Sequence, residues 1–141
     1  MKGKIRAVPS PAQGFLELIG LEFTRLETGF SRSELEITAA LLNPYDTLHG
    51  GVIYSLADTG MGGALSTCLG ADERCATIEI KITYLKSNRS GRLTCDTRLV
   101  HQGKGIAFLE SVVKDGKGAL LATAMGTFHI FAGSSKATEK K

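Results

Sequence analysis

A single segment of this 141-residue chain has the apolar spacing of a helix, whereas most other segments alternate like strands. From Gly51 to Leu69, apolar residues recur every three or four positions, and Gly70 follows as a stop signal. On both sides of this segment, apolar residues occupy every second position. One long helix among many strands can bury its apolar face only against a sheet, so the pattern predicts an α+β fold.

Two of the expected strands precede the helix and four follow it. Turn signals such as Thr28-Gly29 and Asp115-Gly116 separate them. We expect one antiparallel sheet, with the last four strands in a meander. The expected ranges are 15–29 (beginning with a helical turn), 32–41, 75–85, 92–102, 106–115 and 119–131.

Length and composition predict one globular domain. The chain is 43% hydrophobic and 22% charged, which is ordinary for a globular protein. We expect this domain to span 13–132, with a flexible arm at 1–12 and a disordered tail at 133–141. The net charge of +3 is too small to indicate nucleic acid, but it would suit a small anionic ligand.

The chain has no run of apolar residues long enough to cross a membrane and no apolar core of a signal peptide after its first lysines. Its three cysteines have spacings that fit neither a metal site nor a disulfide framework. Reduced thiols are typical of the cytoplasm, which is the expected location. We expect no membrane partner, no nucleic acid partner and no metal.

Three glycines, Gly60, Gly62 and Gly63, lie inside the expected helix. Each costs about 1 kcal/mol relative to alanine in a helix interior. Their small size would let another segment approach closely, either the chain's own sheet or a helix of a partner subunit. The alternative is a helix that breaks near Gly62.

The helix is preceded by an unusual combination of residues. The stretch NPYDTLHGGVIYSLADTG places Asn43 six residues before His49-Gly50-Gly51, and Asp58 nine residues after His49. The first turn of a helix has free N–H groups and a positive dipole end. Glycine there lets a substrate carbonyl come close, as stabilisation of an oxyanion requires. Asp58 lies beside the apolar stripe, where an acid can serve as a base or a nucleophile.

These residues, with the strand ATIEIKITYLKS and the turn QGKGIAF, resemble the hotdog-fold thioesterases, above all the phenylacetate-degradation branch. The resemblance implies an antiparallel six-stranded sheet wrapped around one central helix, and hydrolysis of an aryl- or medium-chain acyl-CoA. It implies that the Gly50 N–H binds the carbonyl oxygen, that His49 orients or polarises the thioester, and that Asn43 positions either water or the carbonyl. Thr77 would hold water beside Asp58.

Other residues are weaker candidates. Gly51 and Ser55 are expected near the substrate. Lys86, Arg89, Gly103 and Lys104 are expected near coenzyme A, although solvated loop charges explain the cations equally well. No cofactor is expected, because coenzyme A is part of the substrate.

The distance along the helix predicts a shared site. Gly50 and Asp58 are eight residues apart, about 12 Å at 1.5 Å per residue. One carbonyl cannot contact both, whereas an antiparallel partner helix would bring Asp58 of one chain to Gly50 of another. We therefore expect a homodimer as the minimal unit, doubled to a homotetramer.

Two other functions compete with thioester hydrolysis. A hotdog dehydratase would act on a 3-hydroxyacyl thioester, but it uses a different pairing of histidine and acid. A non-catalytic acyl-CoA-binding hotdog protein that regulates transcription would need a DNA-binding module, for which we expect no room before Phe15. The sequence does not specify the acyl group, or whether Asp58 is the nucleophile or the general base.

Overall fold

The computed structural model describes residues 14–133. The expected arm at 1–12 and all of the expected tail except Gly133 lie outside the described residues. Within them, the order of elements agrees with the order predicted from the sequence. The elements are α1 (Gly14–Ile19), β1 (Glu22–Glu27), β2 (Phe30–Glu36), the 3-10 helix η1 (Ala39–Leu41), α2 (Gly50–Ser66), β3 (Glu73–Tyr84), β4 (Arg92–Gln102), β5 (Ile106–Lys114) and β6 (Leu120–Ala132).

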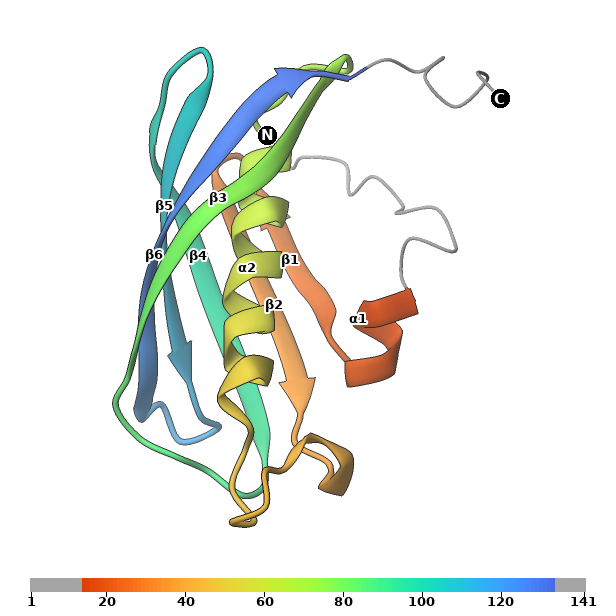
Figure 1. Cartoon of the computed structure of the whole chain (residues 1–141), viewed down its shortest axis with the longest axis vertical. Coiled ribbons are helices and arrows are strands. Elements are labelled where there is room, and N and C mark those ends of the chain that lie inside the picture. The colour runs from red at the N-terminus through yellow and green to blue at the C-terminus, as the bar shows by residue number, and fades with distance from the viewer. Residues whose placement is uncertain (1–13, 134–141) are drawn as a thin grey trace.

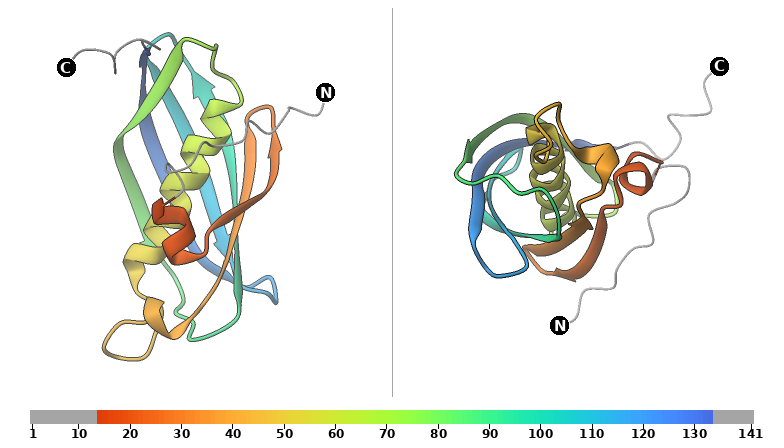
Figure 2. Two further views of the ribbon diagram at one scale, coloured as in Figure 1. Left: turned by 90° about the vertical axis from the view of Figure 1, so that its right-hand side faces the viewer. Right: turned by 90° about the horizontal axis from the view of Figure 1, so that it is seen from below.

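The strands form one antiparallel sheet in the order β1-β2-β4-β5-β6-β3. The sheet curls around α2, which is seen end-on in the right-hand view of Figure 2. The expected meander of four strands is wrong for β3, which pairs with β6 and not with β4. Apolar alternation indicates which face of a strand is buried, but it does not specify the neighbouring strand. The segment between β3 and β4 crosses one end of the molecule to begin β4 on the far side of the sheet (Figure 1).

Helix α2 is continuous from Gly50 to Ser66, without a break near Gly62. Its buried face repeats at helical spacing, as the sequence predicts, and it includes Leu56, Met61 and Leu65, which are fully buried. Two apolar clusters, one toward each end of the helix, fill the space between α2 and the sheet. The opposite flank of α2, with Tyr54, Ser55, Asp58 and Gly62, stays partly open.

Two of the helix glycines permit close packing against the chain's own sheet. A Cβ atom on Gly60 would lie 2.7 Å from the Thr97 hydroxyl, and one on Gly63 would lie 2.5 Å from the Phe23 ring. The Ser31 hydroxyl, which is buried, donates a 2.6 Å hydrogen bond to the Gly60 carbonyl. Wrapping by the sheet therefore explains Gly60 and Gly63, but not Gly62, where a Cβ would meet nothing within 4 Å.

The second strand is shorter than the expected range 32–41. It ends at Glu36, and the 3-10 helix η1 follows at Ala39–Leu41. The N–H of Ile37 donates to the carbonyl of Gly91, 2.8 Å away, so Ile37 remains against the sheet. Ala39 is exposed even though the alternation placed it with the apolar residues. A short run of alternating residues does not distinguish a strand from the turn that ends it.

Strand β3 contains a bulge that the sequence did not predict. Thr77 pairs with Phe128 and Glu79 with the adjacent Thr127, so Ile78 is one residue too many on β3. Regular alternation predicts Ile78 inside and Thr77 outside. Instead, Ile78 is 54% exposed, and the Thr77 side chain turns toward α2. A bulge shifts the alternation by one residue and thereby redirects the side chains on one side of it.

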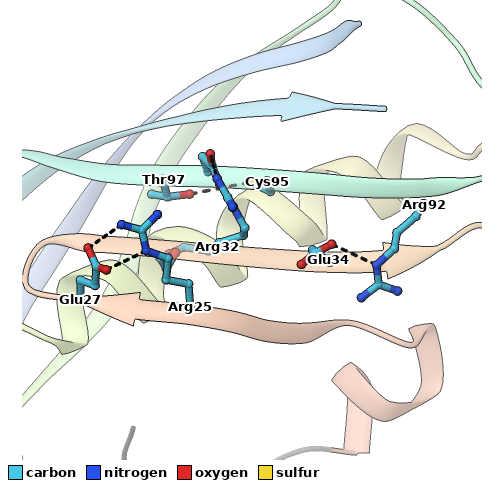
Figure 3. Close-up of polar contacts among 10 residues, drawn as sticks. Arg25, Glu27, Arg32, Glu34, Arg92, Cys95 and Thr97 are labelled. Atoms are coloured by element: carbon cyan, nitrogen blue, oxygen red, sulfur yellow. Dashed lines mark hydrogen bonds and ion pairs between the residues drawn. The ribbon is translucent and has the colours of Figure 1, made fainter. Parts of the chain in front are cut away.

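The outer face of β1, β2 and the adjoining part of β4 has several ion pairs (Figure 3). Arg32 holds the carboxylate of Asp96 with two hydrogen bonds of 2.7 and 2.8 Å. These hydrogen bonds from the guanidinium lower the pKa of the Asp96 carboxyl below its ordinary value. Arg92 bonds Glu34 at 3.0 Å and also contacts Glu22. These charged side chains lie on the face of β1, β2 and β4 that α2 does not cover, whereas further along the sheet the same face exposes Val100, Phe108 and Met125.

Candidate active site

The loop before α2 is organised by Asn43. Its Oδ1 accepts hydrogen bonds from the N–H groups of Tyr45 (2.9 Å) and Thr47 (3.2 Å), and its Nδ2 donates to the Thr47 hydroxyl at 2.9 Å. Asp46 has a φ of 62°, a left-handed conformation that aspartate tolerates better than most residues. Within one chain, the Asn43 side chain therefore shapes the loop that leads to His49 and Gly50.

His49 caps the N-terminus of α2. Its Nδ1 accepts a 2.8 Å hydrogen bond from the N–H of Gly51. A ring nitrogen that accepts has no proton, so neutral His49 has its proton on Nε2 and can donate from there. The N–H of Gly51, an expected substrate contact, is thus already used. His49 itself is exposed.

Gly50, the first residue of α2, directly follows His49. Its N–H has no acceptor among the described residues, which is the usual condition of a first-turn N–H. The Tyr84 hydroxyl donates a 2.8 Å hydrogen bond to the Gly50 carbonyl, and a Cβ on Gly50 would lie 3.2 Å from the Tyr84 ring. Glycine at this position therefore leaves room for the Tyr84 ring beside the helix N-terminus. Sequence reasoning missed Tyr84, because the alternation gave it only an inward position on its strand.

Asp58 lies two turns further along α2 and is half-buried. The Thr77 hydroxyl donates a 2.6 Å hydrogen bond to its Oδ1. Within residues 14–133, no group donates to Oδ2. The bulge in β3 makes this contact possible, because it turns Thr77 inward while Ile80 and Ile82 stay packed against the core. The structure thus joins two residues that are 19 positions apart in the sequence, Asp58 and Thr77.

Gly50 and Asp58 are not brought together within one chain. They are eight residues apart on the uninterrupted helix Gly50–Ser66, a rise of about 12 Å. Ser55 lies between them, and its hydroxyl donates to the Gly51 carbonyl at 2.8 Å. The two groups are therefore two half-sites on the open flank of α2.

A basic cleft lies next to the helix N-terminus. It has a volume of about 620 Å³ and is lined by Thr47, residues 86–92 and residues 115–117. Its four cations are Lys86, Arg89, Arg92 and Lys117, of which Arg92 is paired with Glu34 and Glu22. Lys86 also contacts Asp115 at 3.4 Å. The N–H of Leu48 donates to the Asn88 carbonyl at 2.8 Å, which ties the cleft loop to the residue before His49. Sequence reasoning missed Lys117, which is distant in sequence from the other three cations.

Gly103 and Lys104 lie elsewhere. They form the turn at the end of β4 opposite to Arg92, where the N–H of Gly103 donates to the Ile106 carbonyl at 2.8 Å. An eleven-residue strand separates them from the cleft, a distance of about 35 Å at 3.4 Å per residue. One chain does not bring Lys104 together with Lys86 and Arg89.

Among residues 14–133, no group of three or more histidine, cysteine, aspartate or glutamate side chains is arranged to hold a metal ion. In the same range, none of the helices has the length and apolar character needed to span a membrane.

Comparison with known proteins identifies the family. The model of the thioesterase superfamily matches residues 45–122, which include the helix, Thr77 and the cleft loop. The 1,4-dihydroxy-2-naphthoyl-CoA hydrolase of Listeria monocytogenes is 29% identical over 83% of this chain and 95% of its own. The acyl-coenzyme A thioesterase PaaI of Escherichia coli is 28% identical over 82% of this chain and 81% of its own, which confirms the resemblance to the phenylacetate-degradation branch.

A solved structure gives the same result for the fold. The conserved protein PA5202 from Pseudomonas aeruginosa has a TM-score of 0.81 and 33% identity, covering 87% of this chain and 100% of that one. The six-stranded antiparallel sheet around one long helix is the hotdog fold that the sequence predicts. The chain therefore belongs to the thioesterase superfamily, and it is a hotdog-fold thioester hydrolase.

Proposed function

We propose that this enzyme hydrolyses the thioester of an aryl- or medium-chain acyl-CoA to the free acid and coenzyme A. The observation that carries the proposal is the pair of half-sites on α2: a free N–H at Gly50 and a carboxylate, Asp58, held through one oxygen by Thr77. The two relatives are named for acyl-CoA and 1,4-dihydroxy-2-naphthoyl-CoA. The free cysteines favour a reducing compartment, so we place the enzyme in the cytoplasm.

The complete site would form in a homodimer, with Gly50 of one copy facing Asp58 of a second copy. Strand β3 supports this arrangement, because it is a twelve-residue sheet edge to which no other described strand adds. Long free edges are surfaces for strand pairing. Apolar side chains near this edge are exposed, including Tyr54, Ile78 and Leu85. In light scattering we expect dimers or tetramers, and a fully active monomer would contradict the shared site.

The chemistry assigned to these groups is acyl transfer to water. The carbonyl oxygen accepts from the Gly50 N–H and from His49 Nε2, so negative charge forms where the helix dipole is positive. Asp58 of the second copy takes a proton from water through Oδ2 as the water oxygen bonds to the carbonyl carbon. The C–S bond then breaks, and the proton passes to the sulfur of coenzyme A. In the alternative, Asp58 Oδ2 bonds to the carbonyl carbon and the C–S bond breaks, which gives an anhydride and the thiolate of coenzyme A. Water then hydrolyses the anhydride to the free acid and the Asp58 carboxylate, and its proton passes to the thiolate.

The basic cleft is the proposed site for the phosphates of coenzyme A. Lys86, Arg89 and Lys117 supply positive charge beside the helix N-terminus, and exposed cations attract phosphate. Lys104 would contribute only from a second copy, since it lies at the opposite end of its own chain. This scheme uses no cofactor besides the coenzyme A that arrives with the substrate.

An acyl-CoA panel tests the function. We expect purified enzyme to release free thiol from benzoyl-, phenylacetyl- or hexanoyl-CoA, as measured with a thiol-reactive dye. The rate should exceed that of the same reaction with the Asp58→Asn variant. Loss of water from 3-hydroxyhexanoyl-CoA without thiol release would indicate a dehydratase. Tight binding of acyl-CoA without any turnover would indicate a binding protein.

A further inference from the structure

Gly62 is the helix glycine that packing within the chain does not explain. It lies on the open flank of α2, four residues after Asp58 and four before Ser66, so the three share one ridge of the helix. A Cβ there would meet nothing within 4 Å, in contrast to Gly60 and Gly63. Alanine at this position would favour the helix by about 1 kcal/mol. The missing side chain thus leaves a space that no described residue fills.

The walls of this space belong to the half-site around Asp58. Ser66 bounds it one turn further along α2, where its hydroxyl donates to the Gly62 carbonyl at 2.7 Å. Two residues of β3 lie beside the neighbours of Gly62 on this ridge: the Thr77 hydroxyl is bonded to Asp58, and the Cys75 thiol lies beside the Ser66 hydroxyl. Cys75 packs against the apolar cluster between α2 and the sheet. Burial raises the pKa of the Cys75 thiol, and so does the nearby negative charge of Asp58. Cys75 therefore presents a neutral, half-buried thiol on this side of the space.

The two neighbours of Asp58 on the ridge differ in the room that they leave for an acyl group. The reacting carbonyl must lie within about 3 Å of Asp58, directly or through one water. Along the ridge, Asp58 has Tyr54 on one side and Gly62 on the other. Tyr54 has an aromatic ring that is 36% exposed, whereas Gly62 has no side chain and a Cβ there would meet nothing within 4 Å.

We propose that the acyl group of the substrate lies over Gly62, between Ser66 and Cys75, and that the lack of a side chain at residue 62 sets the largest acyl group accepted. The inference rests on the proposed function, since it places the acyl group relative to Asp58. The lining is small and only weakly polar, which suits an aryl ring or a short alkyl chain. Gly62 is a specificity-determining residue in this view, and it takes no part in the chemical step.

Substitution of Gly62 tests the proposal. For Gly62→Leu we expect kcat/KM to fall about 10-fold or more for phenylacetyl-CoA and hexanoyl-CoA, while acetyl-CoA changes less than about 2-fold, the discrimination that a few methylenes give. Gly62→Ala should lower kcat/KM less, again more for phenylacetyl-CoA and hexanoyl-CoA than for acetyl-CoA. It should also raise the melting temperature. Gly14→Leu, the same change on α1, is the matched control. It should leave the ratios of kcat/KM among the three substrates unchanged.

Two results with Gly62→Leu would overturn the proposal. If the variant converts dimers to monomers in light scattering, the space holds a partner chain and not an acyl group. An equal loss of kcat/KM for all three substrates would show that residue 62 does not select among acyl groups. If wild-type enzyme cleaves no acyl-CoA, the proposed function fails, and a binding measurement still decides where the acyl group lies.

That measurement is thiol labelling of Cys75 in a Cys68→Ala background. Cys95 is fully buried and its pKa is raised to about 11, so it should not react. In the Asp58→Asn variant, hexanoyl-CoA should slow labelling of Cys75 by N-ethylmaleimide at least about threefold, whereas coenzyme A alone should not. Equal labelling with both ligands, at concentrations that saturate binding, would place the acyl group elsewhere.

Discussion

Replacement of Asp58 by asparagine should lower kcat by about 100-fold or more for every acyl-CoA that the enzyme cleaves, the scale of losing a general base. Asparagine has nearly the same shape and keeps an oxygen that can accept the hydrogen bond from Thr77. It cannot take a proton from water or attack a carbonyl efficiently. Steady-state kinetics measure the effect, and a thermal melt within a few degrees of wild type would show that the fold is intact.

An exposed acid outside the site provides the control. Asp72 lies in the turn between α2 and β3, and its exposed side chain makes no hydrogen bond among the described residues. Asp72→Asn removes the same charge and should leave kcat unchanged. An Asp58→Asn variant with wild-type kcat would show that Asp58 is structural, and the proposed mechanism would then be wrong.

Replacement of Gly50 by proline should lower kcat by about 100- to 1000-fold, as the loss of an oxyanion donor does in other acyl transfers. Proline has no N–H but fits the first position of a helix. The preceding residue, His49, is extended with φ −63° and ψ 131°, as a residue before proline prefers to be. Gly50→Ala is the matched control, since it adds a Cβ near Tyr84 but keeps the N–H. The difference between the two variants isolates the hydrogen bond.

Mixing the two inactive variants tests whether the site is shared. A heterodimer of Asp58→Asn and Gly50→Pro chains has one site with both defects and one site with neither. Activity should return to about half of the wild-type value per heterodimer, because the one intact site works independently of the site that has both defects. If exchange of subunits is demonstrated and no activity returns, Gly50 and Asp58 do not act across an interface.

The sequence predicted the elements better than their arrangement. Helical spacing identified α2 and placed Asp58 on its open flank, because the periodicity of a helix specifies which residues share a face. The pairing of β3 with β6 was missed, since it depends on contacts far apart along the chain. The buried hydroxyl groups of Ser31 and Thr97 were also missed. Their burial depends on Gly60, which brings the helix close to the sheet.

Within the candidate site, too, local features could be predicted from the sequence, whereas contacts between distant residues could not. Gly50 and His49 could be located from the sequence because a helix N-terminus has a local signature. Thr77 was identified only through the family resemblance, since alternation along β3 placed it on the wrong face. The same holds for the cations. Lys86 and Arg89 are close in sequence and line one cleft, whereas Lys104 lies at the other end of the molecule.

The bulge at Ile78 also affects which changes in chain length the enzyme can tolerate. Insertion or deletion of one residue in a strand ordinarily exchanges the faces of all the side chains beyond it. Ile78 is already the extra residue, so its deletion would straighten β3 and leave Thr77 and Ile80 two positions apart, both toward α2. A difference of one residue between this chain and a relative can therefore be absorbed at this point. The Asp58–Thr77 pair would keep its geometry through such a deletion.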